Sequence, residues 1–113
     1  HNLRSKVASY FADAEQGWKY AAGFTREDSN SALNVRVWSD YRDTPITDAD
    51  VRQLADKISG AIYCRDDVLQ PESLNAYRRL LSADKHHVLT GCAHFPWEEN
   101  PQAYYRVLFR LLG

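Results

Sequence analysis

The segment HHVLTGCAHFPW, residues 86–97, contains three of the four histidines and one of the two cysteines of the chain. Imidazole nitrogens and thiolate sulfurs are the ligands that zinc prefers in small protein domains. In an extended backbone Cys92 and His94 point to the same side, so they could share one metal ion. His87, or its neighbour His86, would then supply a third ligand. One hypothesis is therefore a small zinc-stabilised domain with His87, Cys92 and His94 as ligands.

The spacing of these residues departs from the C-x₂-C and H-x₃₋₅-H pairs that are typical of zinc domains. An ordinary connection between two elements, with surface histidines and one buried cysteine, accounts for the same segment. This is because free cysteine packs like a small hydrophobic side chain. We favour this second interpretation and expect no cofactor, with zinc as the alternative.

Cys64 and Cys92 also permit one disulfide. In the chain-entropy estimate, closing a loop of about 29 residues stabilises the folded state by about 3.6 kcal/mol. Two buried thiols fit the sequence equally well. A bridged pair would indicate an exported, periplasmic or extracellular chain, and free thiols would indicate an intracellular one, because disulfides persist in oxidising compartments. The disulfide and the zinc site exclude one another if both use Cys92.

Motifs typical of catalysis and of phosphate binding are absent from the sequence. It contains no G-x-S-x-G, no G-x-x-x-x-G-K-[ST] and no G-x-G-x-x-G. No histidine stands near Cys92 in an arrangement that resembles a cysteine-hydrolase signature. The aspartates of residues 40–50 lack the central glycine and the closing glutamate of a calcium-binding EF-hand. We therefore expect a non-catalytic domain.

Aromatic residues make up 12% of the chain, and four of them fall outside the expected core faces. These are Trp38, Tyr41, Phe95 and Trp97, which lie at a strand end or beside turn residues. Large aromatic side chains at such positions are enriched in protein-binding surfaces. We therefore expect the domain to bind a protein partner, or a second copy of itself, through these aromatic residues and the last helix. The alternative is that these rings close the core over a helix end.

The overall charge and hydropathy narrow the classes of partner. Lysine and arginine number 14 and aspartate and glutamate 15, for a net charge of −1. A nucleic-acid-binding domain usually has a basic excess, so we do not expect a nucleic-acid partner. No apolar stretch approaches the roughly 20 residues of a membrane helix, so we expect no membrane insertion.

The length of 113 residues predicts a single globular domain over residues 1–113. Because it begins at His1 and lacks methionine, we expect it to be a fragment or processed portion of a longer protein.

Apolar periodicity and capping signals predict four helices. The first covers about residues 3–24, and the second begins at Thr47, where Asp50 completes a capping box and Gly60 is a plausible stop. The third has Pro71 in its first turn, and the fourth begins at Asn100-Pro101. The side chains expected in the core include Leu3, Val7, Phe11, Trp18, Val51, Leu54, Ile58, Leu74, Tyr77, Leu81, Tyr104, Val107 and Leu111.

LNVRVW, residues 33–38, alternates apolar and polar side chains and predicts a strand. A single strand cannot satisfy its own backbone hydrogen bonds, so it needs a neighbour. AIYC (61–64) and HHVLT (86–90) are the candidates. The sequence therefore predicts a helix-rich α+β fold of about four helices and a small sheet of two or three short strands. If neither candidate is a strand, the alternative is an all-α bundle.

Overall fold

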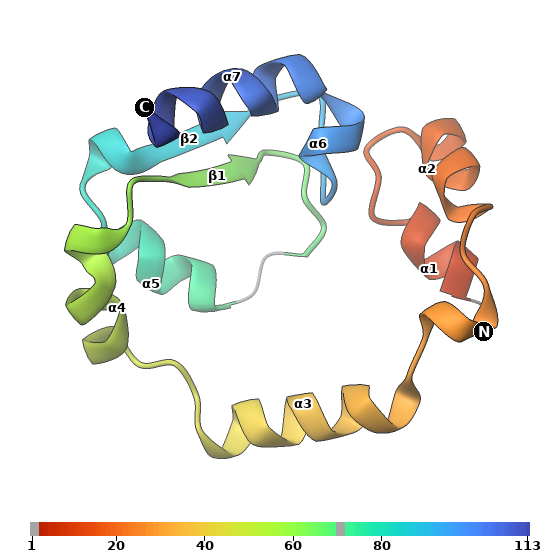
Figure 1. Ribbon diagram of the computed structural model, residues 1–113, viewed down its shortest axis with the longest axis horizontal. Coiled ribbons are helices and arrows are strands. Elements are labelled where there is room, and N and C mark those ends of the chain that lie inside the picture. The colour runs from red at the N-terminus through yellow and green to blue at the C-terminus, as the bar shows by residue number, and fades with distance from the viewer. Residues whose placement is uncertain (1–2, 70–71) are drawn as a thin grey trace.

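A computed structural model describes residues 3–69 and 72–113 (Figure 1). The helices in chain order are α1 (Leu3–Ala8), α2 (Ala14–Ala21), α3 (Ser31–Asp43), α4 (Asp48–Leu54), α5 (Glu72–Leu80), α6 (Pro96–Glu99) and α7 (Pro101–Leu112). The strands are β1 (Ala61–Cys64) and β2 (His86–Leu89), and short 3₁₀ turns cover Arg26–Asp28, Ala55–Lys57 and Ala83–Lys85. The predicted helix-rich α+β class is confirmed, but the described part of the chain contains seven α-helices rather than about four.

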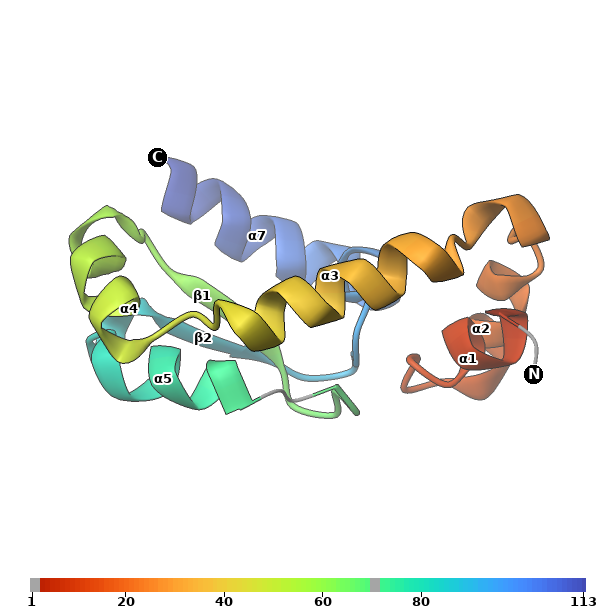
Figure 2. The same ribbon diagram turned by 90° about the horizontal axis from the view of Figure 1, so that it is seen from below.

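The sheet consists of β1 and β2, which run parallel, with Ala61 beside His86 and Cys64 beside Leu89. Parallel neighbours need a crossover connection, and α5 lies within it. Helices α5 and α7 lie on opposite sides of the sheet in both views (Figures 1 and 2). The two candidate strands of the sequence analysis therefore pair with each other.

The predicted strand at residues 33–38 is wrong, because this segment belongs to α3. The side-chain oxygen of Asn30 accepts a hydrogen bond from the amide of Leu33 (2.9 Å) and caps the helix. At the other end the amide of Thr44 donates to the carbonyl of Asp40 (2.8 Å). Alternation of apolar residues indicates a strand only where one face is buried, and no residue of α3 is buried.

The single helix predicted over residues 3–24 is also wrong, since α1 and α2 are separate and packed against each other. Asp13 begins α2, because its carboxylate accepts a hydrogen bond from the amide of Gln16 (2.7 Å). The turn before it places Trp18, expected in the core, on the surface with 54% of its area exposed. The predicted core positions Val7 and Phe11 are buried.

The second predicted helix begins where expected, since Thr47 and Asp50 form both hydrogen bonds of the capping box. Val51 is buried, but the helix ends at Leu54, whose side chain is half exposed, well before Gly60. The first-turn proline of the third predicted helix, Pro71, lies outside the described residues.

The fourth predicted helix is α7, whose cap is confirmed, because the amide of Ala103 donates to the Asn100 side chain (3.4 Å). Of the remaining expected core positions, Val107 and Leu81 are buried, while Tyr77 and Tyr104 are half-buried.

Two hydrophobic clusters are formed by buried side chains of the described residues. One joins the sheet to α7 through Cys64, Leu89, Cys92 and Val107. The other joins α1 to α2 through Val7, Ala8 and Ala21, with Phe95 packed against it. The radius of gyration is 16.0 Å, compared with about 13 Å for a compact domain of this length. The chain is therefore more open than a compact domain of the same length. Figure 1 shows α3 apart from α1 and α2 and apart from the sheet and α7.

Candidate functional site

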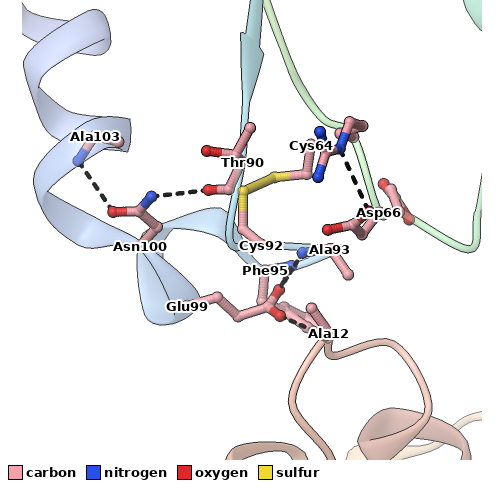
Figure 3. The surroundings of a disulfide bond; sticks show 12 residues. Ala12, Cys64, Asp66, Thr90, Cys92, Ala93, Phe95, Glu99, Asn100 and Ala103 are labelled. Atoms are coloured by element: carbon pink, nitrogen blue, oxygen red, sulfur yellow. Dashed lines mark hydrogen bonds and ion pairs between the residues drawn. A yellow bond between two sulfur atoms is a disulfide. The ribbon is translucent and has the colours of Figure 1, made fainter.

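Cys64 and Cys92 form a disulfide at the carboxyl ends of the two strands (Figure 3). Cys64 is the last residue of β1, and Cys92 follows β2. Their Cα atoms are 5.5 Å apart, and both residues are buried. The disulfide therefore fixes the chain segments that leave the sheet at this edge.

The zinc site suggested by the histidine and cysteine cluster is not formed. Cys92 has no thiolate to offer, because it is part of the disulfide. His94 Nδ1 lies 3.2 Å from the carboxylate of Asp67. His87 Nε2 is buried and has no hydrogen-bond partner among the residues that the structure describes. Within residues 3–69 and 72–113, no three His, Cys, Asp or Glu side chains are grouped so as to hold a metal ion. The segment is instead a strand followed by a turn.

Glu99 organises this turn, and the sequence analysis did not assign it a role. Its Oε2 accepts hydrogen bonds from the backbone amides of Ala93 (2.9 Å) and Phe95 (3.0 Å). Its Oε1 accepts one from the amide of Ala12 (2.6 Å), in the turn between α1 and α2 (Figure 3). One carboxylate thus connects the turn after β2 to the turn between α1 and α2. The only signal in the sequence was a glutamate just before a helix cap, a position also explained by the helix dipole.

A cavity of about 420 Å³ lies beside the disulfide. Its lining includes Cys64 and Ala93 at the strand ends, and Trp97 and Tyr104 from α6 and α7. The rings of Trp97 and Tyr104 meet edge to face with centroids 5.9 Å apart. Most of the lining is therefore apolar or aromatic.

Three side chains with ionisable groups line the same cavity: Asp67, Arg78 and His94. The guanidinium of Arg78 lies over the ring of Tyr63, 5.2 Å from its centroid. Tyr63 is 8% exposed, and its hydroxyl has no hydrogen-bond partner in the described part of the chain. Burial raises the pKa of the Tyr63 hydroxyl, and the positive charge of Arg78 partly opposes this.

The four aromatic residues expected in a binding surface lie on two elements, two of them on α3 and two at the start of α6, and Figure 1 shows these helices apart. Trp38 and Tyr41 are on α3, with their rings edge to face at 6.1 Å, and Trp38 is 63% exposed. Phe95 stacks on Phe11 at 4.9 Å and is half-buried. Trp97 is 41% exposed at the cavity.

The last helix has an exposed apolar face of its own, made by Tyr105, Phe109 and Leu112. The rings of Tyr105 and Phe109 stack with centroids 5.8 Å apart. In the described parts of the chain, no helix combines the length and the hydropathy needed to cross a lipid bilayer.

Comparison of the chain with protein-family models, with curated proteins and with solved structures found no match.

Proposed function

We propose that this chain is a non-catalytic protein-interaction domain and that α3 carries its binding surface. The observation that supports the proposal is the exposure of α3, a helix of 13 residues with none buried. Helices shorter than about 12–15 residues are marginal in water without tertiary contacts. Val35 and Val37 lower the helix propensity further. A helix in this position gains its stability from a molecule that covers its apolar face.

The binding surface, which we name the α3 face, consists of Leu33, Val37, Trp38 and Tyr41. At about 100° per residue these four side chains fall within an arc of about 140°. All four are exposed. Trp and Tyr contribute a large share of binding energy in protein interfaces because they bury a large area at a low cost in conformational entropy.

The partner that the charges favour is a second copy of this chain. Arg36 and Asp40 lie one turn apart on the same flank of the α3 face. Consider two copies of α3 packed antiparallel about a two-fold axis. The flank that carries Arg36 and Asp40 in one copy lies beside the same flank of the other copy, and the residue order along the two flanks is reversed. Arg36 of each copy then lies beside Asp40 of the other. Two such charge pairs flank a seam centred on Val37 and Trp38, which is apolar apart from Asn34.

The size of the α3 face sets the expected affinity. A helix of 13 residues is about 20 Å long. Two such helices bury less than the roughly 1,200 Å² of a standard interface, which is typical of weak and transient complexes. We therefore expect self-association in the micromolar range.

The α3 face includes two of the four aromatic residues expected from the sequence, Trp38 and Tyr41. Phe95 is assigned to packing against the α1–α2 cluster instead, because it lies against that cluster and stacks on Phe11. The outer face of α7 is a second surface of the same apolar kind, but it lacks alternating charges along one flank. The disulfide fits a chain that works in an oxidising compartment.

Sedimentation velocity from low micromolar to submillimolar concentration tests the proposal. The wild-type chain is expected to shift reversibly from monomer to dimer. Val37→Asp places a charge at the centre of the α3 face and abolishes the shift. Val35→Asp is the matched control, because Val35 is on the same helix, exposed and outside the arc of the α3 face, about 60° beyond its edge at Trp38.

A charge exchange identifies the partner as a second copy. Arg36→Asp alone and Asp40→Arg alone each weaken dimerisation, because each places like charges together across the two-fold axis. The double variant Arg36→Asp/Asp40→Arg restores it. A wild-type chain that stays monomeric throughout, or equal effects of Val37→Asp and Val35→Asp, contradicts the proposal.

A further inference from the structure

The cavity beside the disulfide lies at the carboxyl ends of the two parallel strands. Cys64 and Ala93, which line it, are at or just beyond these ends. Ligands of open parallel sheets bind outside this edge, where the chain segments diverge to opposite sides of the sheet. Here α5 and α7 are on opposite sides (Figure 2). The volume of about 420 Å³ is in the range of small-molecule sites.

One wall of the cavity carries a positive charge without an acidic partner. Within the described residues, Arg78 makes no ion pair with a carboxylate; its guanidinium rests on the Tyr63 ring. The next residue differs: Arg79 pairs with Asp48, with Nη2 and Oδ2 3.3 Å apart. The planar fork of Arg78 is thus available to an anion, which it can bind through two parallel hydrogen bonds.

The acidic group of the cavity is already engaged by other groups of the chain. Asp67 lies 3.2 Å from His94 Nδ1, and its side chain is mostly buried. Its Oδ1 also accepts a hydrogen bond from the amide of Leu69 (2.8 Å). The guanidinium of Arg78 is therefore the ionic group of the cavity that is left for a ligand, among the residues that the structure describes.

The remaining walls suit a flat apolar body. Trp97 and Tyr104 stand edge to face on one side, and Leu69 lines the cavity as well. Trp97 keeps 41% of its surface exposed although it lies beside other aromatic rings. An aromatic ring placed against Trp97 would cover this surface and add an aromatic pair to the contacts that Trp97 already makes.

We propose that this cavity binds a small aromatic carboxylate, with its carboxylate on Arg78 and its ring against Trp97 and Tyr104. The site is separate from the α3 face and independent of the function proposed above. Figure 1 shows α3 apart from β1, α6 and α7, whose residues line the cavity.

Titration with three related probes, followed by amide and indole resonances in NMR, tests this site. The probes are phenylacetate, its neutral analogue 2-phenylethanol and the cation phenethylamine. Phenylacetate is expected to shift the amides of Ala93 and His94 and the indole N–H of Trp97. It should bind at least about tenfold more tightly than the other two, which gain no charge-assisted hydrogen bond.

Arg78→Gln removes the guanidinium and is expected to weaken phenylacetate binding about tenfold or more. Arg79→Gln is the matched control on the same helix and should change the affinity by less than about twofold. Trp97→Ala should weaken all three probes together. Preservation of the remaining spectrum shows that each variant is folded.

The phenylacetate titration is repeated in the Val37→Asp variant, which is expected not to dimerise. This distinguishes failure of the cavity site from failure of the proposed self-association. Unchanged phenylacetate binding there supports an independent site, whether or not the chain dimerises. Three results overturn the proposal: no shifts at high phenylacetate concentration, a preference for phenethylamine, or equal effects of Arg78→Gln and Arg79→Gln.

Discussion

The carboxylate of Glu99 accepts a hydrogen bond of 2.6 Å from the backbone amide of Ala12, although 87 positions separate the two residues. The same carboxylate holds the turn after β2 through two further amides. Nearby, the amide of His94 donates to the carbonyl of Tyr10 (2.9 Å), and the side chain of Gln16 donates to the carbonyl of Glu98 (2.9 Å). These three hydrogen bonds, made by Glu99, His94 and Glu98, therefore attach the two N-terminal helices to the segment that follows β2.

Glu99→Ala is expected to lower the free energy of unfolding by about 2–4 kcal/mol, because three amides lose a charged acceptor. Glu98→Ala is the matched control, since Glu98 is exposed and the substitution keeps its backbone carbonyl, which accepts the hydrogen bond from Gln16. Urea denaturation measures the difference, and amide exchange at Ala12, Ala93 and Phe95 locates it. Equal stability of the two variants would refute this role of Glu99.

Gly17→Ala is expected to destabilise the contact between α1 and α2 although alanine is the better helix former. A Cβ atom at Gly17 would lie 2.5 Å from the carbonyl oxygen of Ala8, so the helices would have to move apart. The cost is about 1–3 kcal/mol. At Gly23 the nearest atom would be an ordinary 3.7 Å away, and Gly23→Ala should change stability by less than about 0.5 kcal/mol. Thermal unfolding of both variants measures the contrast, which would vanish if α1 and α2 were not in close contact.

Reduction of the Cys64–Cys92 disulfide is expected to lower stability by about 2–4 kcal/mol, because the unfolded chain regains the freedom of the closed loop. The sequence separation of the two cysteines is 28. Urea denaturation with and without reductant gives the value. The double variant Cys64→Ala/Cys92→Ala should match the reduced chain and remain indifferent to reductant. A reduced chain as stable as the oxidised one would contradict the expectation.

Tyr63→Phe tests the buried hydroxyl under alkaline conditions. Because burial raises the pKa of Tyr63 above its ordinary value of 10.0, the folded state holds this proton more tightly than the unfolded state. The protonated hydroxyl of Tyr63 therefore makes its full contribution to the free energy of unfolding below pH 10. This contribution is lost as the pH rises through the pKa of Tyr63 in the folded state. Tyr63→Phe should lose less stability than the wild type above pH 10.

At neutral pH Tyr63→Phe should be as stable as the wild type, because the hydroxyl has no hydrogen-bond partner within residues 3–69 and 72–113. The matched control is Tyr105→Phe, since Tyr105 is exposed on α7. It should follow the wild type at every pH. Urea denaturation across the alkaline range gives both curves, and a Tyr63→Phe variant that follows the wild type above pH 10 would contradict the argument.

Signals contained in a few neighbouring residues predicted the structure well. The Thr47 and Asp50 capping box and the Asn100 cap both form as expected, because each depends only on side chains within one helical turn. The two short strands were recognised as candidates for the same reason. Their parallel pairing was not predictable, because it depends on the crossover that brings distant segments together.

Apolar patterns gave wrong predictions where their meaning depends on what the segment packs against. The alternation at residues 33–38 presumes a sheet with one buried face, and α3 has no buried face at all. The apolar repeat of residues 3–24 continues through the turn at Asp13, so periodicity could not reveal the break. At the cavity, His94 and Trp97 were noted as neighbours in sequence. Arg78 was not, because only the folding of α5 beside the sheet brings it to them.

The attachment of α1 and α2 to the sheet has a consequence for exchange between molecules. The contacts of Phe95 and Glu99 with the N-terminal helices are non-covalent, and the chain that leads from Ala21 to Asp48 runs through the exposed α3. Nothing in these contacts distinguishes the helices of one molecule from those of another. If two molecules exchanged residues 3–24 by domain swapping, every contact described for these residues would be preserved. The conformation of the segment that includes α3 would then determine whether residues 3–24 pack on their own molecule or on a second copy.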